Sequence, residues 1–580
     1  MDIKCREVVT LQFGNYANFV GTHWWNLQDA SLSYESKQQQ CCEIDSGVLF
    51  REGQNLSGHP TYTPRLILMD LKGSLTSLKQ EGLLYSDGKH NSSLTWEGNV
   101  AVHREEPAVK SSFLKGPETL DEQLTADHSS KTLSDCKGIP KTGVVSQAFD
   151  ASKKSLGLEN SVQLWSDYLQ VHLHPRTISV IHDYSHDEQS SQFAAFGQGE
   201  GLFNCPRFQD DLEDRLHFFV EECDYLQGFQ VLCDLHNGFS GLSAKTVELL
   251  QDEYHGKGIL TCGVTPFSGA DPSLPKNIYR LINTVLGIVS LSSDSSLFCP
   301  LSVNRNMGRR SLLTTTFPYV IYDASLNYQT SALLATALET MTLPYRLHTF
   351  PVSMSQLTDT MCSSGRKVVV AQASIPFPMK YSSTLPDVLS IHPDATLWQT
   401  LSPCAEFKDL RCFAQSVVLR GINRPNQVSH LRPGIEPDSV LQMYTSGEEV
   451  LGAYLHNLNP STLSTALHLI ESPCRLAASY PQIFTSQVNR RGFLQESKSE
   501  TAVKSIPVLT RLQSSPVLHK VLSSLYEEVN ALDIRRYSSF ISAGTELDEF
   551  REALQKLRSL SQLYKMSFNL DESDDDSDTD

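Results

Sequence analysis

Residues 229–254 read FQVLCDLHNGFSGLSAKTVELLQDEY, and along them the apolar pattern changes from that of a strand to that of a helix. Phe229–Leu235 is typical of a buried strand, which ends at the Gly/Ser turn Asn237–Leu242. Ser243–Tyr254 has helical spacing, and Ile259–Val264 is a further strand. Strands that alternate with helices across short loops predict a parallel sheet covered by helices on both faces, with ligands at the carboxyl ends of the strands.

The same alternation extends towards the N-terminus. Glu7–Gln12 is a β-branched strand that ends at a Phe-Gly-Asn turn, and Ala17–Gln28 has helical spacing. Pro64–Leu71 is a buried strand whose end brings Asp70 to the rim of the sheet, so Asp70 is a candidate site residue. Later segments continue the pattern: Trp165–Leu173 as helix, Thr177–His182 as strand, Phe193–Gly201 as a glycine-rich loop and Gln209–Cys223 as helix.

Composition divides the rest of the chain. We expect a doubly wound, nucleotide-type domain over residues 1–270 with a polar insertion at about 75–160, a second α+β domain over 271–460, a loop-rich segment over 461–504, a helical hairpin over 505–570 and an acidic stretch over 571–580. The hairpin is predicted from two amphipathic repeats with charged outer faces. Seven of the last ten residues are acidic, which predicts disorder there.

Charge and cysteine content exclude several classes of protein. Lys and Arg number 48 against 66 Asp and Glu, a net charge of −18, which argues against binding nucleic acid. The 13 cysteines form no C-x-x-C pair, which favours a reduced, cytosol-facing compartment. The N-terminal residues lack the pattern of a targeting segment, and the apolar-leaning run Tyr279–Leu291 is too short and polar to span a membrane. We therefore expect any membrane association to be peripheral.

Three glycine turns, at Gly14–Gly21, Gly197–Gly201 and Gly238–Gly241, are each predicted to follow a strand and precede a helix. Backbone N–H groups at such turns can hold phosphate, because helix N-termini carry partial positive charge. Tight connections between strand and helix are the alternative interpretation, and it stays open here.

Other motifs fail on spacing or composition. The third turn lacks the last glycine of G-x-S-x-G, and the Lys-Thr pair that follows has the wrong spacing for a P-loop. A histidine group lacks the carboxylates or cysteines that would complete a metal site, so solvated loop histidines are the favoured interpretation: His172, His174, His182 and His186.

An ordered set of segments resembles tubulin. REVVTLQFGNYANFVGTHWWN (6–26) is similar to its opening strand, nucleotide loop and helix, and TPRLILMDLKGSL (63–75) is similar to its second strand and acidic loop. FGQGEG (196–201), ECDYLQGFQ (222–230), RCFAQSVVLRG (411–421) and the final hairpin follow in the same order. Within that superfamily, Trp24-Trp25, the 61–75 block and the 216–241 block resemble the Misato family, tubulin-related regulators of mitochondrial distribution and morphology.

Departures from tubulin imply a degenerate nucleotide site. The phosphate loop is the shorter His236–Gly241, in which we expect Phe239 to crowd a phosphate. Lys72 replaces an acid near the metal, so Mg²⁺ would lose a partner, and Val352–Gln356 lacks the acids of the hydrolysis-promoting loop. The resemblance places the degenerate loops at Gly14, Asn15, Asp70, Lys72, Gly197, Gly199, Gly238, Ser240 and Gly241, with no catalytic residue, no metal and no cofactor expected.

The resemblance implies a non-catalytic regulator of mitochondrial distribution, morphology, fusion and inheritance. It implies a cytoplasmic location, peripheral association with the cytosolic face of the mitochondrial outer membrane and protein partners there. One alternative is a GTPase that binds GTP or GDP and uses Lys72 as a phosphate counter-charge. Another is an assembly factor in cell division that associates with microtubules, tubulin or a chaperonin.

Overall fold

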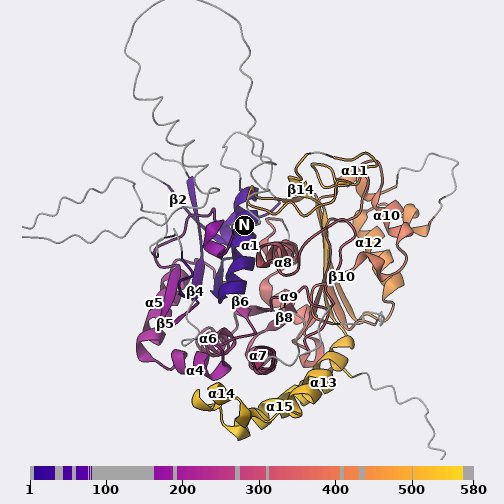
Figure 1. Cartoon of the computed structure of the whole chain (residues 1–580). Coiled ribbons are helices and arrows are strands. Elements are labelled where there is room, and N and C mark those ends of the chain that lie inside the picture. The colour runs from indigo at the N-terminus through magenta and orange to yellow at the C-terminus, as the bar shows by residue number, and fades with distance from the viewer. Residues whose placement is uncertain are drawn as a thin grey trace, which may run out of the picture.

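Six parallel strands form the first of two large sheets in the protein (Figure 1). The structure is a computed structural model that describes residues 6–32, 43–54, 60–75, 78, 80, 162–186, 192–267, 275–308, 313–349, 351–404, 411–429, 437, 439–499 and 501–565. The strand order is β5-β4-β1-β6-β7-β8, so the winding reverses beside β1 and the doubly wound prediction is confirmed. The strands are β1 (Val8–Phe13), β4 (Leu66–Lys72), β5 (Ile178–Ser185), β6 (Gly228–Asp234), β7 (Gly258–Val264) and β8 (Leu297–Leu301).

Helices cover both faces of this sheet. Successive residues of β1 face opposite sides: Val8 joins the core beneath one helical layer, and Val9 joins the core beneath the other. The first layer contains α1 (Asn15–Ser31) and α8 (Asn327–Met341). The second contains α4 (Phe196–Phe203), α5 (Pro206–Glu221), α6 (Phe239–Glu253) and α7 (Pro275–Asp294).

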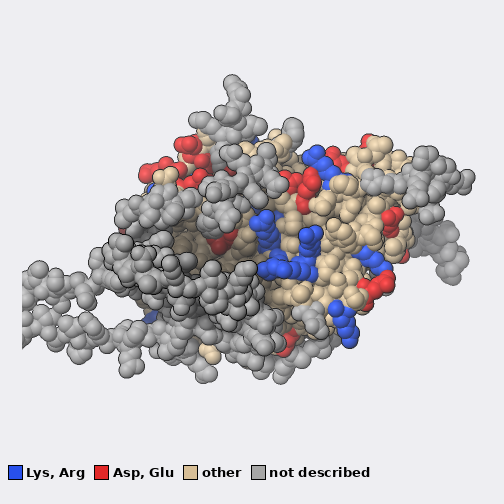
Figure 2. Space-filling model, turned by 90° about the horizontal axis from the view of Figure 1, so that it is seen from above, with Lys and Arg blue, Asp and Glu red and all other residues tan. Residues whose placement is uncertain are grey.

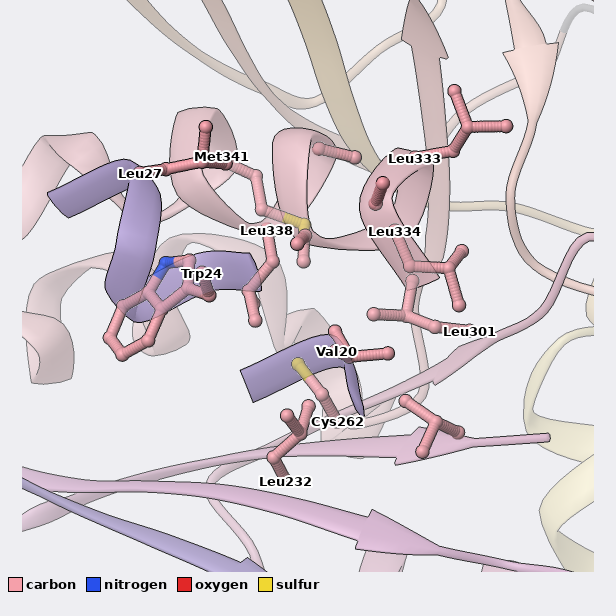
Figure 3. Close-up of a cluster of buried hydrophobic side chains, with 14 of the residues drawn as sticks. Val20, Trp24, Leu27, Leu232, Cys262, Leu301, Leu333, Leu334, Leu338 and Met341 are labelled. Atoms are coloured by element: carbon pink, nitrogen blue, oxygen red, sulfur yellow. The ribbon is translucent and has the colours of Figure 1, made fainter. Parts of the chain in front are cut away.

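A tightly packed cluster joins α1, α8 and the strands. Figure 3 shows Val20 and Trp24 of α1, Leu338 of α8, and the strand residues Leu232 and Cys262 pointing towards one another. Each of these side chains is at most 1% exposed. Full burial of an aliphatic side chain of this size contributes roughly 1.5–3 kcal/mol, so this cluster fixes α1 and α8 on the sheet.

The second sheet is mixed and has the order β10-β9-β15-β11-β12. Its strands are β9 (Val370–Ser374), β10 (Gln399–Thr400), β11 (Ala414–Arg420), β12 (Ser464–Ile470) and β15 (Val508–Ser514). Helix α8 also contacts β11 and β15, so it is shared between the two sheets. The second sheet is completed by α9 (Met354–Met361), α10 (Leu385–Ile391) and α12 (Gly447–Leu458). Smaller elements are β2 (Phe50–Gln54), β3 (Pro60–Pro64), α11 (Arg424–Gln427), β13 (Cys474–Arg475) and β14 (Ser505–Ile506).

Three helices complete the described chain along the lower edge of the molecule in Figure 1. They are α13 (Val517–Asn530), α14 (Ser538–Ser542) and α15 (Leu547–Leu563). The predicted hairpin is confirmed, because α13 packs on α15 and both contact α7. The apolar repeat that predicted it is buried at Leu518, Leu522, Leu525, Val529, Phe550, Leu554, Leu557 and Tyr564.

The structure moves several predicted boundaries. Strand β8 belongs to the first sheet, so that unit extends past residue 270 to Leu301. The loop-rich segment 461–504 contains β12 (STALHLI), most of whose residues are only partly buried, so its strand signal is weak. Strands β14 and β15 precede the hairpin, which begins at Val517. Trp165–Leu173 contains only a 3₁₀ turn over Trp165–Asp167.

Two predictions concern residues outside the described ranges. Most of the polar insertion at about 75–160, where we expect loops or disorder, and the whole acidic stretch 571–580 lie there, so both expectations stay predictions. Within the ranges that are described, every helix is too short or too polar to cross a bilayer.

Candidate functional site

Two acidic residues lie near or at the carboxyl ends of the strands on either side of β1, at the edge where a doubly wound sheet binds ligands. Asp70 lies in β4 and Asp234 is the last residue of β6. Gly14 follows β1 and begins α1. The fold thus brings together Gly14, Asn15 and Asp70 from the sequence prediction, and it adds Asp234, which the prediction did not include.

Asp234 occupies the N-terminus of α1. Its carboxyl oxygens accept hydrogen bonds from the backbone N–H groups of Ala17 (2.8 Å) and Tyr16 (3.3 Å), and from the Asn237 side chain (3.1 Å). Asp234 has 0% exposure. A helix N-terminus attracts anions through these same N–H groups. The protein therefore fills this potential phosphate position with its own side chain.

Gly14 is required by this arrangement. Its φ of 101° lies in the region that favours glycine, and a Cβ atom there would be 2.5 Å from Asp234 Oδ2. The glycine that was predicted to approach a phosphate instead approaches a carboxyl group. Beside it, the Asn15 side-chain oxygen is buried and lacks a hydrogen-bond partner in the described part of the chain.

Asp70 is also saturated by protein contacts. Its Oδ2 accepts from the Trp165 indole N–H (2.8 Å) and the Asn18 amide (3.2 Å). Its Oδ1 accepts from the Leu71 backbone N–H (2.8 Å) and lies 2.9 Å from His186 Nε2. A carboxylate with these partners and 1% exposure holds α1 and the 165–167 turn to β4. A hydrated Mg²⁺ would have to displace several of them.

Lys72 and two of the four predicted histidines are exposed, and the other two histidines contact protein side chains. Lys72 is exposed at the end of β4, which agrees with a solvated surface lysine. His172 and His182 are exposed, and His174 stacks on Phe218 with ring centroids 4.7 Å apart. The interpretation of His186 as a solvated loop histidine is wrong, because the partly buried imidazole contacts Asp70. The described residues contain no group of three side chains that could hold a metal ion.

The third glycine turn makes its hydrogen bonds internally. The Gly238 N–H donates to the Phe193 carbonyl (3.0 Å), and the Phe239 N–H donates to Asn237 Oδ1 (3.0 Å). Ser240 is fully buried and its hydroxyl donates to the Asn237 carbonyl (2.8 Å). These groups stabilise the start of α6 and are not presented to a ligand.

The expected clash of Phe239 with a phosphate is wrong. Helix α6 already begins at Phe239, and the side chain turns into the core, where it is 1% exposed. Its ring packs edge-on against Phe193 at 5.0 Å between centroids. Phe239 instead anchors the start of α6 to the segment before α4.

Gly197 and Gly199 lie in helix α4, so the prediction of a phosphate-binding loop there is wrong. A Cβ atom at Gly199 would be 2.0 Å from the Gly238 carbonyl oxygen, and one at Gly241 would be 2.0 Å from the Phe196 carbonyl oxygen. Gly197 approaches the Ala543 carbonyl in the same way. These glycines allow close packing of helices, which is the physical reason for the pattern that suggested a loop.

A small cavity lies at the ends of β7 and β8. Its volume is about 50 Å³, and its lining includes His236, Arg280 and Asn304. A drug-sized ligand pocket has roughly 300 Å³ or more, whereas this cavity has room for a few water molecules. Three buried atoms that face no hydrogen-bond partner in the described part are His236 Nδ1, Arg280 Nε and Asn304 Oδ1. Burial lowers the pKa of His236 well below its usual value, which keeps the imidazole neutral.

Tyr16 bridges two helix starts at the same edge. It lies in the first turn of α1, is 1% exposed, and donates a hydrogen bond to Thr330 in the first turn of α8 (3.0 Å). Its ring therefore fills space between α1 and α8. Burial raises the pKa of its hydroxyl, so the phenol stays protonated at neutral pH.

The segment that would promote hydrolysis lies at the opposite edge of the sheet. Met354 begins α9 and packs against Gly228 and Gly258, the first residues of β6 and β7. Ser353 caps α9 by accepting from the Gln356 N–H (3.2 Å). Residues 352–356 contain no acid, and Asp359 is exposed on α9. This segment thus has a packing and capping role.

The six-stranded doubly wound sheet, the shared helix α8 and the α+β second unit define a tubulin-like α/β protein. A family profile described as the Misato Segment II tubulin-like domain matches residues 6–119, and one described as a tubulin domain matches residues 156–347. The chain is 48% identical over 565 residues to Protein misato homolog 1 of Bos taurus, covering 97% of this chain and 98% of the bovine one. It is 30% identical over 585 residues to Protein misato of Drosophila melanogaster, covering 96% and 98%. The chain belongs to the Misato family.

Proposed function

We propose that the protein is a non-catalytic, tubulin-like regulator of mitochondrial distribution, morphology, fusion and inheritance. The mitochondrial role rests on the resemblance to the Misato family. The non-catalytic part is supported above all by Asp234, whose carboxyl group takes the α1 N-terminus that a nucleotide phosphate would need. The internal hydrogen bonds at Gly238 and Phe239 support it further, because they engage two backbone N–H groups of that turn that a phosphate would need.

The nucleotide content of the purified full-length protein tests this proposal. We expect denaturation to release far less than one guanine nucleotide per chain, and hydrolysis to match a blank, because protein groups occupy the phosphate positions. In cells depleted of the endogenous protein, wild type and Lys72→Glu should restore mitochondrial shape equally. Stoichiometric nucleotide, together with failed rescue by the Lys72 variant, would favour the GTPase alternative.

We also propose a cytoplasmic location with peripheral attachment to the cytosolic face of the mitochondrial outer membrane, through protein partners there. Alkaline carbonate should release the mitochondrial fraction of the protein, and protease added to intact mitochondria should digest it. Retention in the carbonate pellet or protection from protease would contradict this. Co-sedimentation with microtubules instead would favour the assembly-factor alternative.

A further inference from the structure

Four cationic side chains form a cluster that we term the basic surface: Arg475, Arg490, Arg491 and Lys504. The backbone brings them together from three segments. Arg475 pairs with Ser505 between β13 and β14, and the Lys504 N–H donates to the Arg490 carbonyl (2.8 Å). Figure 2 shows Lys and Arg side chains gathering near the middle of the upper face, the part of the molecule where Figure 1 places β14.

These cations lack ion-pair partners in the described part of the chain. All four residues are exposed, and none has an ion-pair partner among the residues that the structure describes. Neighbouring cations do have partners: Lys380 lies 3.1 Å from Glu496, and Arg424 lies 2.8 Å from Glu471. In a protein with a net charge of −18, four adjacent unpaired cations form a local exception. Their mutual repulsion favours binding of an anionic partner.

We propose that the basic surface binds the acidic stretch 571–580 of a second copy of this chain. That stretch reads DESDDDSDTD and holds seven carboxylates in ten residues. Three of the four cations are arginines, whose planar guanidinium groups bind carboxylates through paired hydrogen bonds. A ten-residue segment with closely spaced carboxylates matches cations that come from three adjacent chain segments.

The position of α15 assigns the acidic stretch to another copy. The described chain ends at Lys565 after α15, which lies along the lower edge in Figure 1, whereas β14 lies along the upper edge. The acidic stretch begins six residues and ends fifteen residues after Lys565, so its two ends lie at most about 22 Å and about 54 Å from Lys565. A folded body made from most of 580 residues has a diameter on the order of 60 Å, so a path over its surface from the lower to the upper edge is about 90 Å. The acidic stretch is therefore too short to follow the surface to the basic surface of its own copy.

Binding of a labelled DESDDDSDTD peptide tests the contact directly. The receptor is the full-length protein with the seven acids of 571–580 changed to Asn or Gln, so that its own stretch does not compete. We expect binding that weakens by about 10-fold or more in Arg490→Glu/Arg491→Glu and in Arg475→Glu/Lys504→Glu, and that is lost as salt rises from about 0.1 M to about 0.5 M. The control Lys520→Glu/Arg536→Glu removes one exposed cation from α13 and one from the turn between α13 and α14, and it should bind the peptide as the parent does.

Sedimentation of the unlabelled proteins tests the second copy. Wild type should associate at low salt, and both the neutral-stretch variant and Arg490→Glu/Arg491→Glu should stay monomeric while keeping the wild-type melting temperature. Equal peptide binding by all variants would overturn the proposal. A wild-type monomer at all concentrations, with peptide binding intact, would also overturn it. Binding to vesicles of phosphatidylcholine and phosphatidylserine but not to the peptide would assign the surface to a membrane instead.

Discussion

Asp234 is fully buried at the end of β6, and burial raises the pKa of its carboxyl to about 7, although hydrogen bonds from Ala17 and Asn237 act in the opposite direction. In the unfolded chain the same group ionises near its ordinary value of 3.8. Between these two pH values the folded protein binds more protons at this site than the unfolded chain does. Stability from this group is therefore complete below about pH 4 and is lost as the pH rises through about 7.

Replacement of Asp234 by asparagine should make this pH dependence visible. Asparagine has a similar shape but cannot ionise, so the penalty for a buried charge disappears. We expect urea unfolding to show that Asp234→Asn gains stability relative to wild type between about pH 5 and pH 8, by roughly 2–4 kcal/mol. The variant Asp359→Asn is the control for removal of a carboxylate that is exposed instead of buried. A difference in stability between Asp234→Asn and wild type that stays constant with pH would contradict the raised pKa of Asp234.

The two acids at this edge, Asp70 and Asp234, differ in how far the sequence predicts their roles. Asp70 is predicted because it lies near the end of a buried strand, and the same rule applied to the strand Phe229–Leu235 selects Asp234. The partners of Asp70 could not be predicted in that way. Trp165 and His186 are distant in sequence and reach Asp70 only through folding. A carboxylate at a strand end therefore predicts the edge of the sheet where a site can lie. The groups that bind this carboxylate depend on tertiary contacts.

At the scale of elements, the crossing of α4 and α6 shapes the edge of the first sheet. Gly199 and Gly241 each place a hydrogen atom where a Cβ would be 2.0 Å from a backbone oxygen of the other helix. Backbone atoms cannot move aside as a side-chain end can. The two helices therefore pack at this distance only because both positions are glycine.

Alanine at two glycines of the same helix should separate packing from helix propensity. Gly199→Ala should lower the free energy of unfolding by at least about 2 kcal/mol, because the methyl group overlaps the Gly238 carbonyl. Gly201→Ala adds a methyl group with nothing within 4 Å, and should raise stability by about 0.5–1 kcal/mol. Denaturant unfolding of the two variants measures the contrast. Equal effects would show that the α4–α6 contact is looser than the structure indicates.

The elements themselves were partly predictable. The apolar periods of residues 229–264 predict strand, helix and strand correctly, and the apolar repeats of α13 and α15 predict those two helices. In these segments most of the residues that the pattern marks as apolar are buried. The segment FGQGEG predicts a loop, because glycine disfavours helices. In the structure it forms most of α4, where its packing against α6 favours the helix. Strand β12 is mostly half-buried, and its sequence gives a weak strand signal. Its backbone pairing with β11 is what makes this segment a strand.

At the scale of the whole molecule, α8 joins the two sheets through a buried ion cluster. Glu339 of α8 forms an ion pair with Arg420 at the end of β11, and lies 3.5 Å from Arg346. Arg346 also donates to Gln28 of α1 (2.7 Å). All three charged side chains are at most 2% exposed. Burial opposes ionisation of Glu339, but the two arginines hold the pKa of its carboxyl below the usual value.

Removal of the Glu339 charge should destabilise both units of the molecule, because two buried guanidinium groups would lose their only ion-pair partner among the described residues. Glu339→Gln should cost about 3–5 kcal/mol, whereas Glu248→Gln, at an exposed pair with Lys245, should cost under about 1 kcal/mol. Because the folded pKa of Glu339 is lowered, wild type should lose this stabilisation as acid protonates the carboxyl, and the gap between wild type and Glu339→Gln should narrow. Native-state hydrogen exchange should show faster exchange in both β11 and α1, the two elements that the cluster connects. Faster exchange in β11 alone, or in α1 alone, would mean that the cluster stabilises one unit and does not couple the two.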